Sequence, residues 1–216
     1  YTSLRFNEMT VSPEIDAATI TDPRLGAIRE DIETRYGFSP SNEALSQALL
    51  TVASERAYHP VREYLDGLQW DGVQRLDAVG PVYLGAEASP INTTCLRAWF
   101  ISAVARAMRP GCKVDTCLVL VGPQGVGKST LMEAAGKLVG TGSLSVPPEK
   151  MDIQAIVTRM FGEEGMRKRL FTIDNLKGHL QSSELTSLIT QPHISGRANY
   201  RGEGTRPNTM SYCLSL

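Results

Sequence analysis

The chain has 216 residues, of which 42% are hydrophobic and 21% charged. That composition is typical of an ordinary globular protein, either one large domain or a compact domain with a smaller companion. The net charge of −1 excludes a general attraction to nucleic-acid phosphates. Residues 1–116 carry 11 Lys and Arg against 15 Asp and Glu, and residues 159–216 carry 8 against 5. A nucleic-acid surface would therefore be local and C-terminal, although solvated faces of mixed charge explain the same counts.

Helical spacing of apolar residues dominates the chain up to Pro110. Four helices are predicted from caps, prolines and apolar stripes, and they begin at Asp22-Pro23, Ser41, His59-Pro60 and just after Asn92. We therefore expect an N-terminal extension over residues 1–22 and a small all-helical domain over residues 23–111.

After Pro110 short apolar runs alternate with helices, which is typical of a parallel sheet joined by crossover helices. The predicted strands cover residues 117–121, 144–146, 170–173 and 209–216. The predicted helices cover residues 128–139, a segment from Asp152 through Met160, and a segment that opens at Ser183. Residues 112–216 are thus expected to form an α/β domain.

Residues 122–129 read GPQGVGKS and fit G-x-x-x-x-G-K-[ST] between a predicted strand and a predicted helix. Glycines let backbone N–H groups turn around a β-phosphate, and the helix adds the positive end of its dipole. Lys128 can reach the β and γ oxygens, and the Ser129 hydroxyl can coordinate Mg²⁺. The predicted cofactors are ATP and Mg²⁺. The predicted binding residues, named here the glycine loop, are Gly122, Pro123, Gln124, Gly125, Val126, Gly127, Lys128, Ser129 and Thr130.

This motif predicts the P-loop NTPase fold, an α/β class with a parallel sheet and crossover helices, preceded by the small all-helical domain. The ATPase core would occupy residues 112–216 and be truncated at its C-terminus, because the chain stops inside its last predicted strand.

Asp174, directly after a buried strand, is the predicted second ligand of Mg²⁺ beside Ser129 across the sheet. The alternative is that Asp174 caps the following turn. Asn175 stands where many such ATPases carry a glutamate that activates water, and an amide cannot accept that proton. The predicted catalytic residues are Lys128, Asp174 and Asn175, with Asn175 orienting water. Either Asp174 also serves as the base or hydrolysis is slow; Glu163 and Glu164 are weaker candidates.

Three arginines, Arg197, Arg201 and Arg206, lie in a Gly-rich stretch expected to be exposed. They are candidates for arginine fingers that stabilise charge on the γ-phosphate of a neighbouring subunit, or for contacts to DNA phosphates. Tyr200 is available to stack on a base. An ordinary charged surface loop explains the same residues.

A tryptophan and two arginines before the glycine loop also lead to structural predictions. Trp70 is interpreted as a packed tryptophan before a tight turn at Asp71-Gly72. Arg106 and Arg109 are expected on the polar side of their helix, facing solvent, nucleotide or a neighbouring subunit.

The four cysteines contain no CxxC pair and lie far from the three histidines, so a structural zinc site is not expected. Scattered thiols indicate a reduced, intracellular protein. No apolar run approaches the roughly 20 residues of a membrane span, and the N-terminus lacks the regions of a secretory signal. We expect a cytoplasmic protein without a membrane partner, and the missing initiator Met indicates a fragment.

With these residues in place, the chain resembles the virulence-associated protein E family of P-loop proteins carried by phages and other mobile elements. The resemblance covers roughly residues 20–216 and rests on HPVREYL (59–65), LQWDGVQRLD (68–77), VARAMRPGCK (104–113) and GPQGVGKS (122–129). It implies an ATPase core similar to primase-associated and superfamily 3 replication helicases, which work as rings on DNA. The family often has an acidic residue at the position of Asn175, and its polar sensor after the last strand would lie beyond Leu216.

Three functions are compatible with this sequence. The first is an ATP-driven motor domain of a phage or mobile-element replication protein, acting on DNA that is expected to be single-stranded and assembling as a homo-oligomeric ring when full-length. The second is an ATP-binding switch that hydrolyses slowly and recruits partners in phage interference. A small-molecule kinase is the third, and it is disfavoured because no arginine-rich lid follows the loop.

Overall fold

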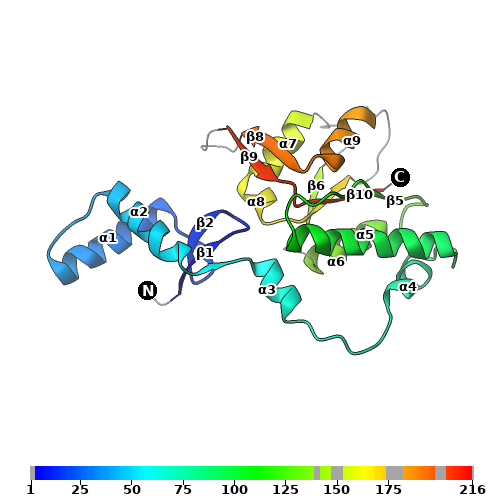
Figure 1. Cartoon of the computed structure of the whole chain (residues 1–216), viewed down its shortest axis with the longest axis horizontal. Coiled ribbons are helices and arrows are strands. Elements are labelled where there is room, and N and C mark those ends of the chain that lie inside the picture. The colour runs from blue at the N-terminus through cyan, green and yellow to red at the C-terminus, as the bar shows by residue number, and fades with distance from the viewer. Residues whose placement is uncertain (1–2, 139–141, 147–152, 174–181, 198–202, 216) are drawn as a thin grey trace. The chain divides into compact units, whose positions relative to one another are not determined.

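The computed structural model describes residues 3–138, 142–146, 153–173, 182–197 and 203–215. The chain divides into two compact units, Tyr1–Gly67 and Leu68–Leu216, which are described separately (Figure 1). No helix in the described ranges is both long and apolar enough to cross a membrane.

The first unit combines a four-stranded sheet of order β3-β2-β1-β4 with helices. β2 is antiparallel to β1 and β3, whereas β4 is parallel to β1. The strands are β1 (Leu4–Asn7), β2 (Ser12–Ile15), β3 (Ala18–Thr19) and β4 (Ala57–Tyr58). The helices are α1 (Asp22–Tyr36), α2 (Asn42–Ser54) and α3 (Pro60–Asp66). The buried core is formed by Leu4, Ile15, Ile28, Leu45, Leu49 and Ala53.

These strands show that the predicted extension over residues 1–22 and the all-helical domain after it are wrong. The sequence signals for the strands are weak. The β2–β3 turn consists of Asp16 and Ala17, with φ of 55° and 60°, whereas such two-residue turns usually carry Asn-Gly or Asp-Gly. Pro13 lies within β2, where a proline normally argues against a strand.

The boundary between the units also differs from the predicted one at 111/112. Helix α5 (Pro90–Met108), which we assigned to the helical domain, packs on the sheet of the second unit. The indole Nε1 of Trp99 donates a hydrogen bond of 2.9 Å to the carbonyl of Tyr212 in that sheet. Residues 68–111 therefore belong to the second unit.

The second unit is built on four parallel strands in the order β5-β10-β7-β6 (Figure 1). These are β5 (Leu118–Leu120), β6 (Ser143–Val146), β7 (Leu170–Ile173) and β10 (Ser211–Ser215). The predicted α/β class with a parallel sheet is confirmed. The last strand in sequence, β10, lies between β5 and β7.

Helices cover both faces of this sheet (Figure 1). One face, under α5 and α6 (Lys128–Leu138), buries Leu118, Leu120, Leu170 and Cys213. The other, under α7 (Ile153–Phe161) and α9 (Ser182–Thr190), buries Phe171, Ile173, Tyr212 and Leu214. The alternation follows from the two-residue period of a strand. The unit also contains three short helical elements: α4 (Leu76–Ala78), a π-helical turn η1 (Val79–Tyr83) and α8 (Glu163–Met166).

The Gly-rich stretch predicted as an exposed loop contains two antiparallel strands, β8 (His193–Arg197) and β9 (Glu203–Pro207). Ile194 is buried in the same core as α7. A Cβ on Gly196 would lie 2.4 Å from the Val157 side chain, so β8 approaches α7 closely. The sequence pattern did not predict these strands, because their residues are largely polar or glycine and show no apolar alternation. The strands are defined by their pairing with each other.

Arg106 on α5 is fully buried, with 0% of its surface exposed, so the expectation that it faces solvent, nucleotide or a neighbour is wrong. Its guanidinium donates to the carbonyl oxygens of Val114 at 2.9 Å, Ile189 at 2.7 Å and Met210. Burial lowers the pKa of Arg106 from its usual value. The side chain therefore connects α5 by hydrogen bonds to α9 and to the segment before β10. Arg109, by contrast, is exposed as expected.

Candidate nucleotide site

The glycine loop joins β5 to α6 at the carboxyl edge of the parallel sheet. β5 ends at Leu120 and α6 begins at Lys128. The backbone N–H of Leu131 donates to the carbonyl of Gly127 at 2.9 Å, which fixes the loop to the first turn of the helix. In open α/β sheets, ligands bind outside the carboxyl ends of the strands. The loop thus occupies a position suited to a ligand.

Gly125 and Gly127 both have φ of 88°, a left-handed conformation that side chains disfavour. A Cβ on Gly125 would meet nothing within 4 Å, and one on Gly127 would lie 3.4 Å from the carbonyl oxygen of Tyr83. The backbone conformation, rather than crowding, therefore requires glycine at these positions. Left-handed turns that lead into a helix N-terminus form concavities that bind anions.

Lys128 folds back over the loop that precedes it. Its Nζ donates to the carbonyl oxygens of Gly122 at 2.6 Å and Pro123 at 2.9 Å. An ammonium group has three N–H donors, so it can make a further bond to a ligand oxygen. An anion seated in the loop would thus meet a positive charge held in place by the loop itself.

A pocket of about 430 Å³ lies between α6 and strands β6 and β7. It is lined by Ser129, Thr130, Met132, Glu133, Ser143, Ser145 and Thr172. Ser129, the predicted magnesium ligand, and Thr172 on β7 therefore border one cavity whose lining residues are mostly polar. Oxygen-bearing side chains of this kind suit a hard cation such as Mg²⁺.

Residues 65–171 match the family model of the virulence-associated protein E-like domain. This chain carries a virulence-associated protein E-like domain. The match includes the glycine loop, α5, β5 and α6, and it confirms the resemblance to this family over residues 65–171. It ends within β7, before Asp174.

Two solved structures of the NrS-1 C-terminal region have a similar fold. The A form apo structure gives a TM-score of 0.58 at 10% identity and covers 98% of this chain and 53% of that chain. The A form apo structure of residues 305–718 gives 0.56 at 11% identity and covers 98% and 52%. The present chain thus spans about half the length of these structures, and at such identities the likeness shows the fold alone. No curated protein matches the chain.

Asp174 and Asn175 lie outside both the described residues and the matched segment, so their roles remain predictions. β7, which precedes them in the chain, is not adjacent to β5, because β10 lies between the two. In register, Ile173 pairs with Leu214, which pairs with Val119. β5 and β7 are therefore roughly 9–10 Å apart, two strand spacings.

Glu133 is a candidate residue of the nucleotide site that the sequence motifs did not identify. It stands four residues after Ser129, on the same side of α6, and lines the same pocket. Its Oε1 lies 3.6 Å from Nζ of Lys137, one turn further on. The spacing of four residues from Ser129 is the signal that identifies it.

The three predicted arginines, which follow the matched segment in the chain, differ in their surroundings. Arg206 on β9 donates to the carbonyl of Met160 at 3.2 Å, and its guanidinium lies 4.3 Å from the centre of the Phe161 ring. It thus packs against α7. Arg197 ends β8, where its backbone pairs with Glu203, and Arg201 lies outside the described residues. Their roles as fingers or DNA contacts remain predictions.

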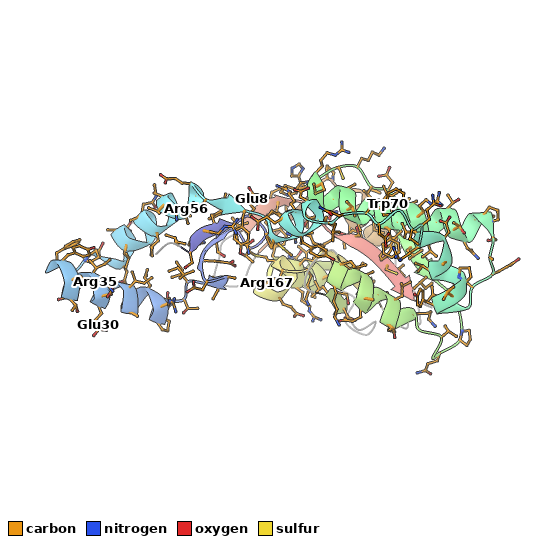
Figure 2. The ribbon with its side chains drawn as sticks, turned by 90° about the horizontal axis from the view of Figure 1, so that it is seen from below. Glu8, Glu30, Arg35, Arg56, Trp70 and Arg167 are labelled. Carbon is orange, nitrogen blue, oxygen red and sulfur yellow. The ribbon has the colours of Figure 1, made fainter. Side chains whose placement is uncertain are left out.

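Trp70 does not pack in the domain core, contrary to our interpretation, because 76% of its surface is exposed (Figure 2). The tight turn after it is confirmed. Gly72 has φ of 83°, and Asp71 accepts a bond of 3.1 Å from the N–H of Val73. The bidentate hydrogen bonds from Arg75 lower the pKa of Asp71.

Proposed function

We propose that this chain is the ATP-binding and ATP-hydrolysing motor domain of a phage or mobile-element DNA replication protein of the helicase type, with a P-loop NTPase fold. The observation that carries the proposal is the glycine loop between β5 and α6. There two left-handed glycines and the Lys128 ammonium group meet at the carboxyl edge of a parallel sheet. The family match supports the replication context.

Each residue of the site has a distinct role. The loop N–H groups and the N-terminus of α6 hold the β-phosphate, and Lys128 neutralises charge on the β and γ oxygens. Ser129 supplies a hydroxyl ligand for Mg²⁺, in a pocket whose oxygen-rich lining fits that cation. When bound, Mg²⁺ supplies further charge neutralisation as water attacks the γ-phosphate in line.

The alternation along β7 supports Asp174 as the second magnesium ligand. Thr172 lines the Ser129 pocket, and Leu170 lies in the core under α6. The two-residue period of a strand, continued to position 174, predicts a side chain on this same side. Glu133, in the same pocket, is a second carboxylate available to a cation or to water.

For the DNA contact we propose the end of the β8–β9 hairpin. Arg197 and Arg201 fall at or between the ends of the two strands, whereas the Arg206 guanidinium packs against Phe161 and Met160. Residues 159–216 also carry the chain's positive balance of charge. Phosphate contacts of this kind bind DNA without regard to sequence.

The experiment that tests the proposal is phosphate release from ATP, measured with and without single-stranded DNA, on the chain and on two variants. Lys128→Ala should abolish ATP binding and turnover, since it removes the ammonium group at the phosphates. Lys113→Ala is the matched control, because it removes an exposed ammonium group that lines neither the polar nor the apolar pocket beside the loop. It should leave DNA-stimulated turnover within about twofold of the parent.

Each outcome has a definite meaning. Absence of ATP binding in the parent chain would refute the nucleotide site. Tight binding with negligible turnover, with or without DNA, would favour the switch, which the amide at Asn175 also favours. Phosphate transferred to an added nucleoside or sugar would indicate a kinase.

A further inference from the structure

An apolar pocket of about 360 Å³ opens beside the glycine loop, within the second unit. Its walls come from η1, α5 and α6, with Tyr83, Phe100, Leu131 and Leu138 among the lining side chains. Tyr83 is 71% exposed and Leu138 is 50% exposed. Large apolar groups that border a concave pocket and remain open to solvent are typical of a ligand site.

The pocket is continuous with the glycine loop. Gly127 and Thr130, both predicted triphosphate-binding residues, line it. The carbonyl oxygen of Tyr83 lies 3.4 Å from the Cβ position of Gly127, so η1 packs directly on the loop. In a nucleotide held by its β- and γ-phosphates, only the α-phosphate and the ribose separate the loop from the base. The base must therefore lie beside the loop.

The apolar pocket and the Ser129 pocket both border the loop, and they lie on opposite sides of α6. Leu131, Ala134 and Leu138 line the apolar pocket, whereas Ser129 and Glu133 line the polar one. The spacing of three and four residues within each set puts each on its own helical face. The polar pocket suits a cation and phosphate oxygens, and the apolar pocket suits a flat heteroaromatic ring.

We propose that the apolar pocket binds the nucleobase of the triphosphate, with Tyr83 and Phe100 packed on the ring. Among the described residues that line the pocket, none carries a carboxylate, amide or cationic side chain. Guanine presents an additional carbonyl and ring N–H that would need partners, and burying them unpaired costs free energy. The pocket therefore selects adenine over guanine. This inference rests on the proposed function, because the phosphates must occupy the glycine loop.

The test compares three ligands by titration calorimetry: Mg-ATP, Mg-GTP and Mg-tripolyphosphate, which lacks a base. The parent chain should bind ATP at least about tenfold more tightly than tripolyphosphate or GTP, because the base packs on aromatic side chains. Ala134→Trp fills the pocket from an exposed helical position. It should weaken ATP binding about tenfold and leave tripolyphosphate binding within about twofold.

Tyr83→Ala is a second variant, and it keeps the test decisive if the tryptophan variant fails to fold. The exposed Tyr83 side chain should contribute several-fold to ATP binding and nothing to tripolyphosphate binding. Val82→Ala is the matched control, because Val82 is an exposed neighbour in η1 that does not line the pocket. Circular dichroism of each variant verifies the fold.

The outcomes separate this inference from the proposed function. If ATP and tripolyphosphate bind the parent equally, or if both pocket variants bind ATP as the parent does, the base pocket is refuted and the phosphate site stands. If neither ligand binds the parent, or if Lys128→Ala still binds tripolyphosphate, the proposed function fails and the base pocket fails with it.

Discussion

Arg106 and Glu14 illustrate how buried polar residues depend on specific partners. Arg106 donates to three carbonyl groups from separate segments of the second unit. In the first unit, the buried Glu14 accepts hydrogen bonds from Asn7 Nδ2 at 3.0 Å and from the Tyr58 hydroxyl at 2.6 Å. In both cases the loss of one partner removes a hydrogen bond from a buried polar group, which is more costly than the loss of an exposed one.

Replacing Arg106 by Met should lower the free energy of unfolding by about 2–4 kcal/mol, because it leaves three buried carbonyl groups without their donor. Urea unfolding followed by circular dichroism measures the change. Arg109→Met, an exposed change in the residue after the same helix, should stay within about 0.5 kcal/mol of the parent. Equal losses of unfolding free energy in the two variants would contradict the stabilising role of the Arg106 hydrogen bonds.

Tyr58 predicts a loss of stability at high pH. Burial and the hydrogen bond to Glu14 raise the pKa of Tyr58 to about 12, whereas an unfolded tyrosine has a pKa of about 10. The protonated form is thus favoured by folding, so its contribution is complete below about pH 10 and is lost as the pH rises towards 12. Between about pH 9 and pH 11, urea unfolding should show a smaller loss of stability in Tyr58→Phe than in the parent. An identical pH dependence would refute this coupling.

At the scale of elements, α6 is the helix that positions both pockets, and its packing is tight at Gly136. A Cβ there would lie 2.5 Å from the carbonyl carbon of Gly142 and 2.6 Å from the backbone nitrogen of Ser143. These atoms are backbone at the start of β6, so they cannot yield as a side-chain end would. The close contact of helix and strand sets the position of the Ser129 pocket between them.

Gly136→Ala should destabilise the protein by about 1–3 kcal/mol, although alanine favours a helix over glycine by about 1 kcal/mol. Gly26→Ala, within α1, is the matched control, because a Cβ at Gly26 would meet nothing within 4 Å. It should stabilise by about 0.5–1 kcal/mol. Thermal unfolding of both variants checks the opposite signs, and stabilisation by Gly136→Ala would show that α6 and β6 are not packed as described.

At the scale of the whole molecule, the two units are joined through an exposed segment. All residues from Gly67 to Arg75 are exposed, and the Trp70 indole lies at the surface. The glycine loop and both pockets lie entirely within Leu68–Leu216. Nucleotide binding should therefore depend on the second unit alone.

Limited chymotrypsin digestion should cleave first at Leu68 or Trp70, since exposed irregular segments are the preferred sites of nicking. Mass spectrometry of the first products identifies the cut, and the larger fragment should retain ATP binding by calorimetry. Trp99 provides the internal control, because it is buried and should resist cleavage. Early cleavage at Trp99, or a larger fragment that no longer binds ATP, would contradict this division of the chain.

The sequence by itself determined the elements that have local signals. Ser41 caps α2 as predicted, with its hydroxyl oxygen 3.2 Å from the N–H of Ala44. Apolar runs identified β5 and β7, and a two-residue alternation identified β10, all within one or two residues. The glycine loop follows β5 because its left-handed turns require glycine. Helical periodicity, caps and left-handed glycines act over a few residues, so a single sequence reports them.

Only the tertiary structure decided which distant residues meet. The placement of β10 between β5 and β7 and the pairing of β1 with β4, some fifty residues later, have no local signature. The burial of Arg106 and the position of Ser129 and Thr172 in one pocket also have no local signature in the sequence. The physical reason is that sheet pairing and burial depend on contacts between segments far apart in sequence, whereas propensity and capping act within one turn.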